Sequence, residues 1–266
     1  MVDGEYVDDA VAVYGENHLK VAENLEAGYH TVTISKGAGT PSLGNLVFKS
    51  VTYSGQLVTP TVNDLQFMFL GDSITDTAGI LGAYPTDALD EAQRQLTTQN
   101  IRLGYAALTT KAFGADFTQV SFAGKTIPEV MCLFREEQFP NAGGYADYVY
   151  GSNDTVDKDV VVINLGTNVS ADMTGDAKAA LSTVRAKYPN AYIVWVYGMR
   201  ETDYNDTLRT AVEEWAAENG DTKTSYCFLG AASNDEGGDR HPLPQYHAQA
   251  AEILTAHIAT FLDTNA

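Results

Sequence analysis

Four short apolar segments that alternate with stretches of helical period constrain the fold of this chain more than any other feature. The segments read FMFLG, VVVINLG, YIVWVYG and YCFLGA, and all of them follow Leu65. Short runs that are apolar almost throughout are typical of strands buried on both faces of a parallel sheet. We therefore predict an α/β domain in which helices cover both faces of a parallel sheet.

The segments between and after these strands carry apolar residues at helical spacing. Each stripe is expected to be the core-facing side of a helix, and the last one to be a closing helix. The stripes comprise Ala177, Ala180, Leu181, Val184 and Tyr188, then Leu208, Ala211, Val212 and Trp215, and finally Ala251, Leu254, Ile258 and Phe261.

The residues before Pro60 follow a different pattern. Runs such as YHTVTISK and NLVFKSVTYS alternate apolar and polar residues, and Gly, Asn and Ser separate them. This pattern predicts antiparallel β-strands. We place the boundary at the proline, which gives a β-sandwich or jelly-roll-like module over residues 1–60 and the α/β domain over residues 61–266. So small a module would be marginal alone, so we expect it to pack on the larger domain or on a second copy of itself. Its abrupt start indicates an incomplete module, with a natively short form as the alternative.

Charge and composition exclude several classes of function. Sixteen Lys and Arg stand against 35 Asp and Glu, which gives a net charge of −19. Such a charge repels nucleic-acid phosphates and anionic lipids, and no apolar run approaches the about 18 residues that span a bilayer. We expect neither nucleic acid nor a membrane as a partner. Cys132 and Cys227 lie in apolar runs and are expected to be buried free thiols rather than a disulfide.

Small and polar residues follow four strand-like segments, one of which is QVSFA before Gly124. They are Gly71-Asp72-Ser73, then Gly124, then Gly166-Thr167-Asn168, and finally the GGDRHP loop with His241. Loops at the carboxyl ends of parallel strands meet at one edge of the sheet, the usual ligand site of this architecture. Considered without the other residues, Ser73 is typical of a helix cap and Asn168 of a turn. Together with His241 they supply the nucleophile, base and amide donor that acyl transfer needs.

The position of Ser73 indicates how it would act. We expect it to begin a helix directly after a strand, where its backbone N–H and the helix dipole would stabilise an oxyanion. No metal is expected, because His241 and His247 lack a third ligand at a suitable spacing. The AGKT stretch is not a phosphate-binding loop, since Gln119 occupies the position where such a loop requires glycine.

These residues resemble the four motif blocks of the SGNH, or GDSL-type, hydrolases. GDSIT matches the first block, Gly124 in SFAGKTI the second, GTN the third and DRHP the last, in order and over about residues 65–262. The resemblance implies a flavodoxin-like three-layer fold with Ser73 as nucleophile and His241 as base. It also implies an oxyanion hole made by the backbone N–H groups of Ser73 and Gly124 and the side chain of Asn168.

A narrower resemblance is to carbohydrate esterase family 2, in which a β jelly-roll module precedes such a domain. The runs NLEAGYHTVTISK and NLVFKSVTYSGQLVTP and the GGDRHP loop carry it. It implies a serine esterase of the acetyl xylan esterase kind, which removes O-acetyl groups from xylan, glucomannan or their oligosaccharides through an acetyl-enzyme, without a metal or cofactor. Candidates for stacking on sugar rings are Tyr84, Tyr105, Trp195 and Tyr197, each of which could equally belong to the core.

The chain departs from the general SGNH pattern beside the histidine. The acid of that pattern lies three residues before the histidine, and Gly238 occupies this position here. Asp239, two residues before His241, is the candidate third member of a triad. A backbone carbonyl could hold the imidazole instead, and we favour such a dyad, or a weakly assisted triad, over a full triad.

Two rival functions stay open at this point. The first is a lipid or thioester hydrolase of the same superfamily, which would use the same serine chemistry. The second is a carbohydrate-binding protein without catalytic activity. The intact Ser73, Asn168 and His241 argue against this binding protein. The stretch MVDGEYVDDA has no signal-peptide pattern. We expect a secreted protein whose leader lies outside this sequence, with a cytoplasmic location as the alternative. The sequence does not indicate the oligomeric state.

Overall fold

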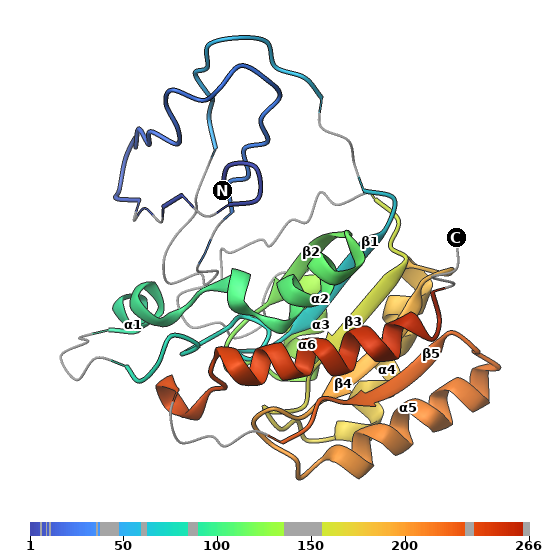
Figure 1. Cartoon of the computed structure of the whole chain (residues 1–266). Coiled ribbons are helices and arrows are strands. Elements are labelled where there is room, and N and C mark those ends of the chain that lie inside the picture. The colour runs from blue at the N-terminus through green and yellow to red at the C-terminus, as the bar shows by residue number, and fades with distance from the viewer. Residues whose placement is uncertain are drawn as a thin grey trace.

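The four apolar segments lie side by side in one parallel sheet (Figure 1). The computed structural model of the chain describes residues 1–5, 7–8, 10, 12–35, 37, 48–59, 63–84, 90–135, 156–231 and 237–262. Within these residues the sheet has five strands in the order β2-β1-β3-β4-β5. They are β1 (Gln66–Gly71), β2 (Asp116–Ser121), β3 (Val160–Asn164), β4 (Tyr192–Tyr197) and β5 (Thr224–Phe228), and every neighbouring pair is parallel. The predicted α/β fold is confirmed.

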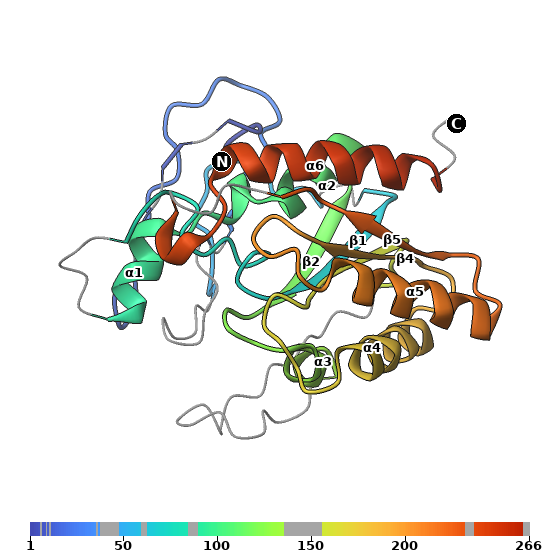
Figure 2. The same cartoon turned by 90° about the horizontal axis from the view of Figure 1, so that it is seen from below.

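Helices cover both faces of this sheet, as Figure 2 shows from below. One face carries α2 (Tyr105–Phe113) and α6 (Pro244–Ala259), and the other carries α3 (Ile127–Phe134), α4 (Met173–Lys187) and α5 (Asn205–Asn219). The remaining described helices are α1 (Glu91–Thr98), η2 (Ile101–Leu103) and η3 (Gly238–Arg240). The three-layer arrangement is therefore the expected one. None of the described helices is long and apolar enough to cross a bilayer.

Alternate side chains of the strands fill two separate cores. Met68 and Leu70 of β1 pack with α3, α4 and α5, whereas Phe67 and Phe69 pack with α2 and α6. The predicted helical stripes face these cores, which confirms the helical periods read from the sequence. Phe261 is the exception, because it follows the end of α6, is only partly buried and stacks on Tyr192.

The jelly-roll-like module is not confirmed. Among the described residues of the first 60, the structure has isolated antiparallel bridges from Val2 to Glu5 and to Val32 and no longer strand. Large apolar side chains such as Tyr14, Tyr29 and Phe48 are exposed there. Part of the run NLVFKS and the proposed boundary lie outside the described residues. The division at residue 60 therefore stays a prediction.

Both cysteines are free thiols, as expected. Cys227 is buried in β5, and desolvation raises the pKa of its thiol to about 11. Cys132 is only partly buried, which differs from the sequence expectation because its helix α3 presents it at the margin of the core.

Candidate active site

The polar strand ends surround one pocket at the carboxyl edge of the sheet. Its volume is about 380 Å³, and its lining comprises Ser73, Ala78, Tyr84, Arg94, Ala123, Gly124, Asn168, Arg200, Asp239 and His241. Ser73, Gly124, Asn168 and Arg200 follow β1, β2, β3 and β4 in turn. Parallel strands bring their carboxyl ends to the same edge, which explains why residues so distant in sequence meet here.

Ser73 and His241 are in direct contact in this pocket. Nε2 of His241 lies 2.7 Å from Oγ of Ser73, and the two residues are only 4% and 3% exposed. Two polar groups at this distance form a hydrogen bond. When Nε2 is unprotonated, the serine hydroxyl donates to it, and this is the geometry from which an imidazole removes the proton of a nucleophile.

The other ring nitrogen of His241 is held by the backbone. Nδ1 lies 2.7 Å from the carbonyl oxygen of Gly238. A carbonyl oxygen accepts but cannot donate, so the proton resides on Nδ1 and Nε2 is left as the acceptor facing Ser73. The contact that a third triad member would make is thus made by Gly238. Asp239 lines the pocket and acts on His241 through its charge, which favours the protonated imidazole.

The loop that carries His241 is tightly packed at Gly238, the position of the acid in the SGNH pattern. The backbone N–H of Gly238 donates to the carbonyl of Gly79 at 3.2 Å, and the ring of Tyr84 lies against Gly238. A Cβ placed on Gly238 would lie 2.5 Å from Cε1 of Tyr84. A side chain at this position would therefore require Tyr84 to move.

The helix expected after Ser73 is absent, and that prediction is wrong. The chain from residue 72 to 82 forms successive turns instead. One helix-like bond is present, from the N–H of Asp76 to the carbonyl of Asp72, but Thr77 follows with φ of 58°, which interrupts any helix. The site therefore depends on individual N–H donors and not on a helix dipole. The hydroxyl of Ser73 contacts His241 and does not cap a helix.

Asp72 supports the turn that presents Ser73, a role that the sequence analysis did not assign. Its side chain is fully buried, and Oδ1 accepts from the N–H of Ile74 at 3.0 Å. Burial raises the pKa of Asp72 to about 7, against the opposing effects of this hydrogen bond and of the positive charge on Arg200. The sequence feature that could have identified Asp72 was its position between Gly71 and Ser73, directly after a predicted strand.

Gly124 and Asn168 supply amide groups on the pocket wall. Nδ2 of Asn168 donates to the carbonyl of Lys125 at 3.1 Å, which ties the side chain to the segment that carries Gly124. Gly124 has φ of 75°, and a Cβ there would meet no atom within 4 Å, so this backbone is open to an approaching ligand. The structure thus brings together all four residues that the SGNH motifs single out.

Three of the four aromatic candidates for sugar binding are core residues, and those predictions are wrong. Tyr105, Trp195 and Tyr197 are fully buried. Tyr105 packs edge-on against Phe69, and the indole of Trp195 donates to the carbonyl of Leu165 at 3.2 Å. Their rings are covered by helices and cannot reach a saccharide.

Tyr84 is the aromatic candidate that lines the pocket. Two charged residues that the sequence analysis missed, Arg94 and Arg200, line it as well. The signal for Arg200 was its place two residues after the strand segment YIVWVYG, at the same sheet edge as the motif residues. Arg94 gave no such signal, because it lies in α1 outside the strand pattern.

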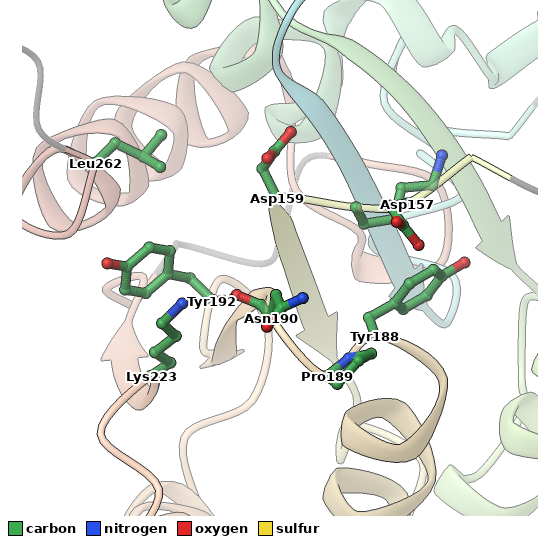
Figure 3. A pocket seen from close by; sticks show the side chains of 9 residues that line it. Asp157, Asp159, Tyr188, Pro189, Asn190, Tyr192, Lys223 and Leu262 are labelled. Carbon is green, nitrogen blue, oxygen red and sulfur yellow. Dashed lines mark hydrogen bonds between the residues drawn. The ribbon is translucent and has the colours of Figure 1, made fainter. Parts of the chain in front are cut away.

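A larger pocket of about 440 Å³ lies at the opposite edge of the sheet (Figure 3). Its lining comprises Asp157, Lys158, Asp159, Tyr188, Pro189, Asn190, Tyr192, Lys223 and Leu262, around the amino ends of β3, β4 and β5. None of these residues is a serine, cysteine or histidine. This lining offers no paired nucleophile and base, so the smaller pocket with Ser73 is the candidate active site.

Comparison with known proteins gives matches in structure. No protein-family model and no curated protein sequence matches the chain. A family two carbohydrate esterase from Clostridium thermocellum, solved in complex with cellohexaose, is similar with a TM-score of 0.64 and 27% identity over 78% of this chain and 67% of that chain. An acetyl xylan esterase from the rumen bacterium Butyrivibrio proteoclasticus has a TM-score of 0.62 and 24% identity over 77% of this chain and 65% of its own.

A third similar structure is a family two carbohydrate esterase from Cellvibrio japonicus, with a TM-score of 0.60 and 20% identity over 78% of this chain and 64% of that chain. The present chain thus spans about two thirds of the length of these solved proteins. The resemblance to carbohydrate esterase family 2 that the motifs predicted is confirmed by these structures, together with the fold of the α/β domain.

Proposed function

We propose that this protein is a carboxylic ester hydrolase that removes O-acetyl groups from plant polysaccharides or their oligosaccharides. The observation that carries the proposal is the buried 2.7 Å contact between Ser73 and His241, in a pocket that also holds Gly124 and Asn168. The similar structures support it, since they include an acetyl xylan esterase and a family two carbohydrate esterase in complex with cellohexaose.

In the proposed acylation step, Oγ of Ser73 attacks the acetyl carbonyl while Nε2 of His241 takes its proton. The carbonyl of Gly238 accepts from Nδ1–H and keeps the ring in the required orientation. The tetrahedral intermediate then collapses, the C–O bond to the sugar breaks, and Nε2 returns the proton to the departing hydroxyl. An acetyl group remains on Ser73.

The negative oxygen of that intermediate would be stabilised by the backbone N–H groups of Ser73 and Gly124 and by Nδ2 of Asn168. Removing one donor of this kind typically lowers turnover about 100- to 1000-fold. Asn168 is already oriented by its bond to Lys125, so little reorganisation is needed when charge develops. In the second step His241 removes a proton from water, the hydroxide attacks the acetyl-enzyme, and acetate leaves with Ser73 restored.

The first prediction tests this function directly. We expect the protein to release acetate from acetylated xylan or glucomannan and to prefer short-chain over long-chain nitrophenyl esters, because the reacting group is a two-carbon acyl chain. Ser73→Ala protein is the matched control for background hydrolysis. A preference for long acyl chains would indicate the lipid or thioester hydrolase, and polysaccharide binding without acetate release above the control would indicate the binding protein.

The second prediction concerns pH. Burial lowers the pKa of His241 below its usual 6.5, the hydrogen bond to the Gly238 carbonyl opposes this, and the charge of Arg200 lowers the pKa further. His241 must be neutral to act as a base, so a lowered pKa preserves activity into more acidic solution. We expect the acidic limb of the pH profile of kcat/KM to lie below pH 6.5.

Two charge variants test the direction of these effects on the pKa of His241. Arg200→Gln removes a positive charge and should move the limb to higher pH, whereas Asp239→Asn removes a negative charge and should move it to lower pH. A limb above pH 6.5 in the unmodified protein, or shifts of the opposite sign, would contradict this account of His241.

A further inference from the structure

We propose that Tyr105 is a positioning residue for the nucleophile, because its buried hydroxyl holds the turn that carries Ser73. This inference rests on the proposed esterase function and adds a residue that acts on the reaction only through Ser73. It follows from a chain of buried contacts that links Thr75 to Tyr105 and Tyr105 to His247.

The turn that carries Ser73 depends on side-chain contacts for its shape. Residues 72–82 form turns, so the regular ladder of backbone hydrogen bonds that would fix a helix is not formed there. Thr75 is only 1% exposed, and its hydroxyl lies 2.9 Å from the hydroxyl of Tyr105. Its carbonyl accepts from Nε2 of Gln119 at 2.9 Å. Thr75 is therefore held by β2 through its backbone and by α2 through its side chain.

Thr75 also packs directly against the end of β1. A Cβ placed on Gly71 would overlap the side chain of Thr75, so the turn folds back closely on the strand. Ser73 lies between these two contacting residues, and a shift of Thr75 is transmitted to it. Oγ of Ser73 must stay within bonding distance of Nε2 of His241, and a misplacement of about 1 Å can lower a rate about 100-fold.

The ring of Tyr105 is fully buried and is held by two other rings. Phe69 packs edge-on against it with 5.8 Å between ring centroids, and His247 stacks on it at 6.1 Å with 15° between the ring planes. Burial raises the pKa of the Tyr105 phenol well above its usual value, although interactions with Thr75 and Asn164 oppose this. The hydroxyl thus keeps its proton and offers Thr75 a partner that is fixed in place and shielded from bulk water.

His247 anchors the backbone at Tyr105. Helix α2 begins at Tyr105, and its N-cap residue Gly104 has no side chain to accept from the first N–H groups. Nδ1 of His247 accepts from the N–H of Tyr105 at 3.2 Å. Burial lowers the pKa of His247 to about 3, so the imidazole stays neutral and keeps this acceptor.

This contact joins the two segments that carry the reacting side chains. His247 belongs to α6, which begins at Pro244, just after His241, and α6 lies beside α2 on one face of the sheet (Figure 2). The chain of contacts therefore runs from the turn of Ser73 through Tyr105 to the helix that follows His241. A tyrosine that merely filled the core would not need a hydroxyl at this position.

Two variants remove the contact between the hydroxyls with little change in shape, since Tyr105→Phe keeps the ring and Thr75→Val keeps a branched side chain. We expect each to lower the rate at which a phosphonofluoridate labels Ser73 by about tenfold. In this reaction Oγ of Ser73 attacks phosphorus, fluoride leaves and the proton passes to His241, so the rate reports on the nucleophile without a deacylation step. The kcat/KM for nitrophenyl acetate should fall by a similar factor.

Two further variants show whether the hydroxyls act together. Thr75→Ser retains a hydroxyl and should stay within about threefold of the unmodified rate. The double variant Tyr105→Phe/Thr75→Val should also lose about tenfold, because groups that act through one shared contact are not additive. Losses that multiply to about 100-fold would contradict a shared contact.

Tyr226→Phe is the matched control for the loss of a tyrosine hydroxyl. The hydroxyl of Tyr226 in β5 donates to Oδ1 of Asn205 at 2.8 Å, and neither residue lines the pocket. We expect Tyr226→Phe and Tyr105→Phe each to lower the unfolding midpoint by about 2–4 °C. Only Tyr105→Phe should slow labelling. Equal rate losses in the two variants, or a rate within twofold of the unmodified protein in Tyr105→Phe, would overturn the positioning role.

Amide hydrogen exchange, measured by NMR, tests the same role without any reaction. The N–H groups of Asp76 and Ala78 donate within the turn, to the carbonyls of Asp72 and Ser73, both at 2.9 Å. They should exchange at least about threefold faster in Tyr105→Phe and at an unchanged rate in Tyr226→Phe. Unchanged exchange in Tyr105→Phe overturns the inference even if esterase activity is found. If the unmodified protein neither labels at Ser73 nor cleaves esters, the proposed function fails, and exchange alone decides whether Tyr105 holds the turn.

Discussion

Replacement of Ser73 by alanine is expected to lower kcat for ester hydrolysis by about 10⁴- to 10⁶-fold, to the level of background. The hydroxyl contacts Nε2 of His241 at 2.7 Å, and no other hydroxyl in the pocket lining takes that position. Stability should change by only about 1 kcal/mol, because a single hydrogen bond is lost in a pocket that water can enter. Acetate release and thermal unfolding of the purified variant measure both effects.

The chain contains a second pair of this kind, which provides a matched control. Oγ of Ser225 in β5 lies 3.0 Å from Nε2 of His257 in α6, and neither residue lines the pocket. Contact between serine and histidine does not create an esterase without amide donors beside the serine. Ser225→Ala should therefore retain activity. If turnover survives Ser73→Ala but is lost in Ser225→Ala, Ser225 and not Ser73 is the nucleophile.

The sheet and the motif residues were predictable because burial leaves a mark on the sequence. Strands covered on both faces are almost entirely apolar. Every residue of β3 is buried, and its sequence VVVIN shows this pattern. The polar residues that end such strands stand out against this background, which is why Ser73, Asn168 and His241 were found. The same logic fails for aromatic rings, since Trp195 and Tyr197 suit a core and a sugar platform equally well.

The remaining features depend on contacts between distant segments, which local sequence does not encode. The turns after Ser73 include Gly79, where a Cβ would lie too close to the carbonyl oxygen of Gly238 in the loop that carries His241. This contact with a distant segment accompanies turns where the local sequence suggested a helix. Arg94 and Arg200 lie outside the motifs, and the fold places both in the lining of the pocket that contains His241. The choice of Gly238 as the partner of Nδ1 likewise follows from how its loop packs.

His241→Ala and Asp239→Asn are expected to differ by orders of magnitude. Loss of the imidazole removes the base, and kcat should fall about 10⁴-fold or more. Loss of the Asp239 charge leaves the hydrogen bond from Nδ1 to the Gly238 carbonyl intact, so kcat should fall less than tenfold. Side-by-side turnover of nitrophenyl acetate by the two variants makes the comparison, with unfolding curves as a check that both are folded.

The physical reason is that a histidine base needs its tautomer fixed more than it needs a carboxylate. A carbonyl oxygen fixes the proton on Nδ1 as a carboxylate would, although it lacks the charge that stabilises an imidazolium. The negative charge of Asp239 stabilises the imidazolium in part, although the hydrogen bond from Nδ1 goes to the Gly238 carbonyl. Gly238→Ala provides the converse test, because a Cβ 2.5 Å from Tyr84 would displace the carbonyl and should cost more activity than Asp239→Asn. Comparable losses from Asp239→Asn and His241→Ala would instead establish Asp239 as the third member of a triad.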